Sequence, residues 1–310
     1  SISSASVSGT TAVGGFAGLT SGMASFTSSL ADGSIDGLTN TGGYVGEADG
    51  DLTITDSTSS ATVSGTTAVG GFAGLTSGTA SFTSSLADGT VDGQNNVGGY
   101  VGQAAGDLSA SDSTSSAMVS GDTAVGGFAG LTSGTASFTN ALADGIVDGI
   151  ANVGGYVGQA AGDLSAFNSI SSASVSGTTA VGGFAGLTSG MASFTSSLAD
   201  GSIDGLTNTG GYVGEADGDL TITDSTSSAT VSGTTAVGGF AGLTSGTASF
   251  TSSLADGTVD GQNNVGGYVG QAAGDLSASD STSSAMVSGD TAVGGFAGLT
   301  SGTASFTNAL

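Results

Sequence analysis

The chain of 310 residues contains no lysine, arginine or histidine, so no basic side chain balances its 25 aspartate and glutamate residues. The formal net charge at neutral pH is −25. Binding to nucleic acid or to anionic lipid requires Lys and Arg side chains, which displace counterions from phosphate groups. The composition therefore excludes nucleic acid as a partner.

Cysteine is also absent, together with proline and tryptophan. Without Cys and His the chain has no thiolate nucleophile, no imidazole general base and no soft metal ligand. A glycosidase needs one singular pair of carboxylates, whereas the pair Asp32 and Asp36 recurs identically along the chain. We therefore expect no enzyme activity and no cofactor, with calcium as the one hard cation that carboxylates suit.

No apolar run approaches the roughly 18 residues of a membrane helix, so we expect no membrane span. The chain opens at Ser1 without a charged leader, and we expect any secretion signal to have been removed or to lie outside this sequence. Hydrophobic residues make up 37% and charged residues 8%, with a positive mean hydropathy of +0.27. Such a chain folds, because disordered chains combine low hydrophobicity with high charge density.

What the sequence does have is exact repetition. Residues 1–142 recur without change as residues 169–310. Within this long repeat, the segment VGGFAG that begins at Val13 returns at Val69, and the variant TGGYVG begins midway between them at Thr41. The elementary 28-residue unit therefore spans residues 13–40, and Phe-type and Tyr-type units alternate. We number positions in each unit from Val13 as position 1 and interpret residues 1–310 as one continuous array without separate domains.

Glycine follows this frame. It occupies positions 2, 3, 6, 10 and 25 of every unit and position 21 of the Phe-type units, which accounts for all 60 glycines. A flexible linker would scatter its glycines. Glycine at fixed phase instead predicts corners with positive φ or places where two backbone segments approach closely.

Between the glycines, small polar and apolar residues alternate, as in residues 24–27 (ASFT) and 52–55 (LTIT). Period-2 alternation predicts short strands, and no stretch carries the 3.6-residue apolar stripe of a helix. A 28-residue repeat with several short strands has the size of one rung of a parallel β-solenoid. We predict an all-β, right-handed parallel β-solenoid of about eleven rungs.

In a solenoid each residue stacks on its counterpart 28 positions later, so inward columns are visible in the sequence. Position 4 is always aromatic and position 23 is always Ile or Val. The predicted inward ladders begin with Phe16, Tyr44, Phe72 and Tyr100, and with Ile35, Val63 and Val91. At positions 12 and 14, Ala24 and Phe26 alternate with Leu52 and Ile54, which predicts compensating volumes in neighbouring rungs.

At positions 20 and 24, Asp in one unit alternates with Ser in the next. Asp32 and Asp36 fall at positions 20 and 24 of a Phe-type unit, where the next unit carries Ser60 and Ser64. Rungs are about 4.8 Å apart, so the alternation separates the carboxylates of one column by about 9.6 Å. We expect like charges never to stack on successive rungs.

The pattern V-G-G-[FY]-[AV]-G, followed by a Ser/Thr-rich strand and a Gly-flanked segment such as residues 31–37 (ADGSIDG), resembles the GLUG-motif repeat of large, adhesin-like bacterial and archaeal surface proteins. The resemblance covers essentially the whole chain. It implies a β-solenoid that serves as a stalk or scaffold at the cell surface.

Two sets of outward residues are candidate sites. The densest acidic segments supply candidate calcium ligands, namely Asp32, Asp36, Asp49 and Asp51. Asp-Gly is also a common corner pair, and calcium-binding β-rolls repeat Asp on every turn, so the turn interpretation is favoured. Positions 13 and 15 predict two outward hydroxyl columns, which begin with Ser25, Thr27, Thr53, Thr55, Ser81 and Thr83.

The function that these observations favour is an extracellular structural filament or stalk. Ordinary repeat sequence at both ends predicts end-to-end continuity, either within a longer polypeptide or between stacked subunits of the same chain. The alternative is a solenoid that binds ice, glycans or another surface through its hydroxyl columns.

Overall fold

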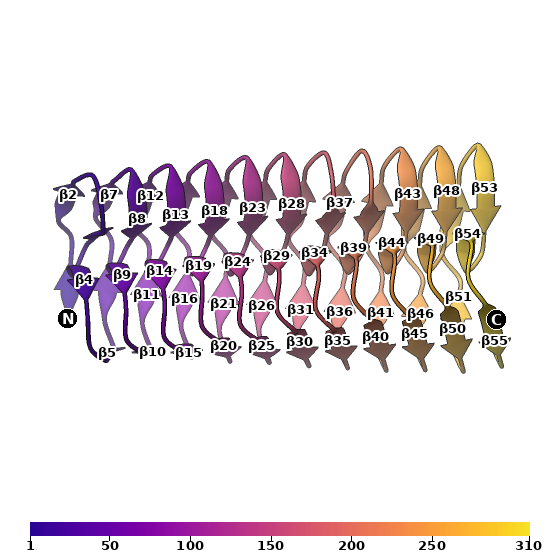
Figure 1. Cartoon of the computed structure of the whole chain (residues 1–310), viewed down its shortest axis with the longest axis horizontal. Coiled ribbons are helices and arrows are strands. Elements are labelled where there is room, and N and C mark those ends of the chain that lie inside the picture. Colours follow the sequence, from indigo (N-terminus) through magenta and orange to yellow (C-terminus); the bar gives the residue numbers. More distant parts are fainter.

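The structure, a computed structural model that describes all 310 residues, consists of strands and corners and contains no helix. A rung contains five strands. One rung comprises β6 (Leu30–Ala31), β7 (Ser34–Asp36), β8 (Thr39–Gly42), β9 (Val45–Ala48) and β10 (Leu52–Thr55). The five recur at 28-residue intervals from β1 (Ile2–Ser3) to β55 (Ala304–Thr307), and Figure 1 shows the rungs side by side between the two chain ends.

Equivalent strands of successive rungs form five parallel sheets of eleven strands each. We name each sheet by its first and last strands. The sheets are β1–β51 (positions 18–19), β2–β52 (positions 22–24), β3–β53 (positions 27–2), β4–β54 (positions 5–8) and β5–β55 (positions 12–15). They wrap around one continuous core of 68 buried residues. The prediction of an all-β parallel solenoid of about eleven rungs is confirmed.

Register does not slip along the array. Ile35 pairs with Val63, and Val63 pairs with Val91, so each residue pairs with its equivalent in the next rung. The corners join the same ladder, since the Gly37 amide donates to Ser64 O at 3.0 Å. Each residue therefore has its own counterpart above and below it, which confirms the inward ladder at position 23.

The aromatic ladder at position 4 runs through the core. Ring centroids of Phe16 and Tyr44 lie 4.8 Å apart, and the rings of Phe72 and Tyr100 lie 4.9 Å apart. The second Phe of each Phe-type rung except the last meets the next tyrosine of this column edge-on, as Phe82 does against Tyr100 at 5.0 Å and 85°. Edge-on and offset contacts are the favourable arrangements of aromatic rings. The predicted ladder is confirmed.

Neighbouring rungs fit because their volumes alternate. Leu52 lies between Ala24 and Ala80, and Ile54 lies between Phe26 and Phe82. Three other Tyr-type rungs place a buried alanine at position 14, and the fourth repeats the isoleucine as Ile222. Large and small residues thus alternate at position 12, while position 14 stacks Phe on Ile or on Ala, and the summed volume of the two positions is shared between neighbouring rungs in a close-packed interior.

Of the two roles predicted for glycine, positive φ is the one that the structure does not use. No glycine has a positive φ, and the left-handed residues are non-glycine residues at positions 16 and 28. Examples are Ser28 (φ 50°), Asn40 (φ 46°), Asp56 (φ 49°) and Ala68 (φ 51°). Asn and Asp tolerate this region because their short polar side chains bond locally. Ala180 and Asn208 are the two position-28 residues outside it.

Close backbone approach is what the glycines permit. A Cβ on Gly42 would lie 2.2 Å from Val45 O, and a Cβ on Gly46 would lie 2.3 Å from the carbonyl carbon of Ala12. Such distances leave no room for a side chain. The β3–β53 and β4–β54 sheets thus pack backbone to backbone, with glycine lining their contact.

The close backbone approach predicts that a Gly→Ala substitution at position 3 destabilises an inner rung but not the last rung. A Cβ on Gly127 would lie 2.1 Å from Gly155 O, whereas a Cβ on Gly295, at the same position of the last rung, meets nothing within 4 Å. We expect Gly127→Ala to lower the free energy of unfolding by about 3 kcal/mol and Gly295→Ala to leave it nearly unchanged. Urea denaturation of the whole chain measures both, and equal losses would contradict this account.

Candidate functional site

The outer columns are the surface along the length of the array, because the side chains of the core point inward. The six predicted hydroxyl residues all lie on the outer face of the β5–β55 sheet, alternating with inward side chains. Neighbouring hydroxyls of this face contact each other, as Ser109 Oγ donates to Ser81 Oγ at 3.3 Å. Phe167 interrupts the column at position 15. Binding of ice or glycan by this face stays a prediction.

In the two columns that contain Asp32 and Asp36, serine hydroxyls donate hydrogen bonds to aspartate carboxylates of a neighbouring rung. Ser64 Oγ donates to Asp36 Oδ1 at 2.8 Å, and Ser60 Oγ donates to Asp88 Oδ1 at 2.5 Å. The same two bonds recur along the array, so position 24 and position 20 each form an Asp–Ser–Asp column. The expectation that carboxylates do not stack is confirmed in these columns, because each serine lies between two carboxylates and donates to one of them.

The four candidate calcium ligands are all exposed and do not converge. Asp32 and Asp36 belong to the two serine-bridged columns. Asp51 Oδ1 instead accepts a bond from the Thr79 amide at 2.9 Å, and Asp49 lies at the corner beside it. No group of three acidic side chains has an arrangement that could hold a metal ion. Calcium binding stays a prediction.

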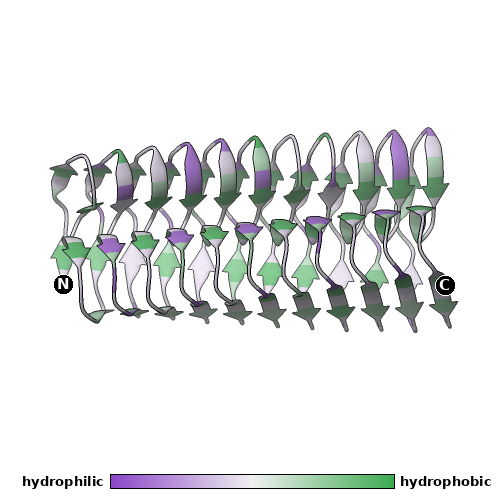
Figure 2. Cartoon of the chain, in the orientation of Figure 1, coloured by the Kyte–Doolittle hydropathy of each residue, from purple (hydrophilic) through white to green (hydrophobic).

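The β4–β54 sheet carries an alternation of another kind. Its outward position 7 holds Leu in Phe-type rungs and Glu or Gln in Tyr-type rungs, which Figure 2 shows as alternating green and purple. The Asn40 amide donates to Glu47 Oε2 at 2.9 Å, and Asn96 donates likewise to Gln103 Oε1 at 3.1 Å. Sequence analysis missed these pairs, whose two members belong to different sheets of one circuit.

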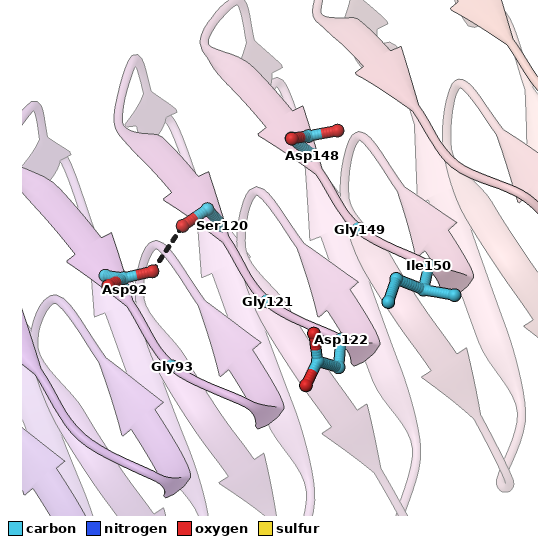
Figure 3. Close-up of a pocket in the computed structure, with 8 residues that line it drawn as sticks. All are labelled: Asp92, Gly93, Ser120, Gly121, Asp122, Asp148, Gly149 and Ile150. Carbon is cyan, nitrogen blue, oxygen red and sulfur yellow. Dashed lines mark hydrogen bonds between the residues drawn. The ribbon is translucent and has the colours of Figure 1, made fainter.

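One surface cleft of about 300 Å³ is present. Positions 24–26 of three consecutive rungs line it, with Asp92, Ser120 and Asp148 on one side and Asp122 and Ile150 on the other (Figure 3). Glycines at position 25 separate the two sides. Figure 3 shows Ser120 bonded to Asp92 while the carboxylate of Asp122 stands apart. Positions 24 and 25 of the cleft belong to repeating columns, whereas the residues at position 26 differ between these rungs.

The interior holds polar groups that sequence analysis did not identify. The Tyr100 hydroxyl donates to Ser85 O and also lies 2.9 Å from Thr114 O. Thr76 and Thr132, at position 8, have buried hydroxyl oxygens without a hydrogen-bond partner. Because alanine alternates with threonine at position 8, these hydroxyls lie singly among alanines and form no polar channel.

Burial also raises the pKa values of the tyrosine hydroxyl groups. Loss of solvent raises the pKa of Tyr44 and of Tyr268 to about 12. The pKa values of the three central tyrosines, Tyr100, Tyr156 and Tyr212, rise further for the same reason. The protein therefore holds all five phenols in the neutral form well above pH 10.

No family model, no curated protein and no solved structure matches this chain. The resemblance to GLUG-motif repeats stays a prediction. No helix in the structure is long and apolar enough to cross a membrane. The columns described above are thus the observations on which a function can be proposed.

The serine-bridged columns predict a charge effect on stability. Ser120 lies between Asp92 and Asp148, so Ser120→Asp would place three carboxylates on successive rungs. We expect it to lower the free energy of unfolding by about 1 kcal/mol at low ionic strength. The control Ser120→Asn keeps a neutral donor and should change stability little. In about 1 M NaCl the two variants should converge, because salt screens exposed charges, and a salt-independent gap between them would contradict this origin.

The tyrosine pKa values predict alkaline unfolding. Folding raises these pKa values above the unfolded value of 10, so their contribution to stability is complete below pH 10 and is lost as the pH rises toward 12. We expect phenolate absorbance to appear in the same step as the loss of β-sheet circular dichroism. The chain unfolded in guanidinium is the control and should titrate near pH 10. Titration near pH 10 with the fold intact would contradict the burial of the phenols.

Proposed function

We propose that the array is an extracellular structural filament or stalk, in which the solenoid continues from rung to rung. The observation that carries this proposal is the unbroken register, because every rung offers the next one the same circuit of backbone groups. Such a circuit templates further strands. Length can therefore increase without any new kind of contact.

Core side chains of inner rungs are buried, whereas the equivalent side chains of the last rung are exposed because no rung follows them. Phe138 is 1% exposed, whereas Phe306, its exact counterpart in the last rung, is 46% exposed. Val125 and Val293 differ in the same way, at 0% and 46%. A further rung, from the same polypeptide or from another copy of the chain, would bury these side chains again. We propose stacking of copies end to end as one way to supply that rung, and continuation within a longer polypeptide as the other.

Durability supports a location outside the cell. Trypsin-like proteases find no Lys or Arg to cut after, and the corners between strands are short. The outward carboxylates are spread along the whole array, which keeps a long acidic rod soluble. These features fit a stalk that must persist unprotected, and the proposal assigns it no catalytic role.

Extension of the chain tests whether the array scales in length. Residue 310 is equivalent to residue 142, so a second copy of residues 143–310 can follow Leu310 in phase. We expect small-angle X-ray scattering to show a rod longer by six rungs, about 29 Å, at unchanged width. The control is the same extension without its first residue, since a one-residue slip turns inward side chains outward. A kinked rod from the in-phase chain would contradict the proposal.

Location needs a separate measurement. Antibodies raised against the folded array should label intact cells of the source organism, and electron microscopy should show the label along thin rods of constant width. Label that appears only after the cells are opened would overturn the extracellular part of the proposal and leave the solenoid unaffected.

A further inference from the structure

One rung departs from the repeat on its outer surface. The Tyr-type unit of residues 153–180, here called the seam rung, carries Phe167, Asn168 and Ile170 at positions 15, 16 and 18. The other four complete Tyr-type units carry a hydroxyl residue, Asp and Thr there, as in the segment 111–114, while Ile2 at the start of the sequence is the equivalent of Ile170. Three outward positions around one corner thus change together, each toward a neutral or apolar side chain.

These side chains are accessible. Phe167 ends β30 (Leu164–Phe167) and is 53% exposed, and Ile170 begins β31 (Ile170–Ser171) and is 39% exposed. Leu142 and Leu198 flank Ile170 in the β1–β51 sheet. In most of this sheet Leu alternates with Thr, so three aliphatic residues in succession are specific to the seam rung and its neighbours.

The same corner is free of carboxylates. Position 16 is Asp in the other four Tyr-type rungs, namely Asp56, Asp112, Asp224 and Asp280. In the seam rung, the Asn168 amide donates to Asn140 Oδ1 at 2.7 Å, and Asn140 donates to Asp112 at 3.0 Å. From Asn140 to Ser196 this column therefore carries no charge. We call Phe167, Asn168 and Ile170, with Asn140, Leu142 and Leu198, the seam patch.

We propose that the seam patch is a lateral contact surface for a second copy of this chain. Two copies that each carry a net charge of −25 approach most closely where neither presents a carboxylate. About a two-fold axis, Phe167 of each copy meets Ile170 of the other, and the Asn168 amides offer both donors and acceptors. A cationic partner would be drawn instead to the acidic columns.

The size of the patch makes this contact weak. It spans three rungs, about 10 Å along the axis, which is far less than the roughly 800 Å² that each partner buries in a stable complex. Asp144 and Asp200 lie just beyond Leu142 and Leu198, so the rim of the patch is acidic. Association should therefore be reversible and should strengthen with salt, which screens the rim. The contact is lateral and does not depend on end-to-end continuation.

The first test restores the ordinary rung. The triple variant F167S/N168D/I170T gives the seam rung the residues of segment 111–114, which the structure already accommodates in a Tyr-type rung. In sedimentation equilibrium at about 0.5 M NaCl, we expect the parent chain to form dimers with rising concentration and the triple variant to associate about tenfold more weakly. The control is Leu206→Gln, an exposed residue replaced by one that its column already uses, which should associate like the parent.

The second test locates the contact. The chain has no cysteine, so a disulfide between two copies can form only at a cysteine that is introduced. Thr195→Cys lies beside Phe167, and Thr83→Cys occupies the same frame position remote from the seam. Under mild oxidation, we expect disulfide dimers of the first to form about tenfold faster.

Three results would overturn the proposal. They are a parent chain that stays monomeric at all concentrations in high salt, a triple variant that associates as strongly as the parent, and equal cross-linking of the two cysteine variants. End-to-end stacking is distinguishable, because it produces open-ended oligomers that the triple variant would still form.

Discussion

Parallel pairing of each residue with its counterpart in the next rung is the constraint on which the whole structure depends. It places identical or equivalent side chains about 4.8 Å apart along every column. A column can hold only residues that tolerate such a neighbour on both sides. Stacked aromatic rings, β-branched residues and bare glycine meet this condition, and these are the residues that repeat at positions 4, 23 and 2.

Where a residue does not tolerate its own kind as a neighbour, the two rung types alternate. Two leucines in succession at position 12 would exceed the available volume, so Leu52 lies between alanines. Two carboxylates in succession would repel, so Ser64 lies between Asp36 and Asp92 and bonds to the first. Packing and electrostatics thus impose the same two-rung period, for different physical reasons.

Most outer columns of this surface repeat the same side chains from rung to rung, and this repetition limits the functions that the surface can have. A binding site that recognises one ligand once needs a singular arrangement, whereas each column here offers the same groups many times. Such repetition is consistent with the filament or stalk that we propose. The seam rung is informative because three of its outward residues depart from the repeat together while its inward residues keep to it.

The sequence by itself determined the relations along the axis. Its 28-residue period, the aromatic and Ile/Val ladders, the exchange of Ala24 for Leu52 and the alternation of Asp with Ser were all predictable, because each residue's axial neighbours are its own repeats. The outward direction of the hydroxyl residues followed from the period-2 alternation of a strand.

Only the tertiary structure decided the relations across a rung. The left-handed corners at Ser28 and Asn40, the glycine-lined contact of Gly46 with Ala12 and the bond from the Asn40 amide to Glu47 depend on where the chain turns within one circuit. The residues of such a pair are not equivalent in the repeat, since their separation, 7 residues for Asn40 and Glu47, is not a multiple of the 28-residue period. The repeated glycines marked the positions where a side chain is excluded. They did not show why it is excluded, because glycine permits both positive φ and close backbone approach.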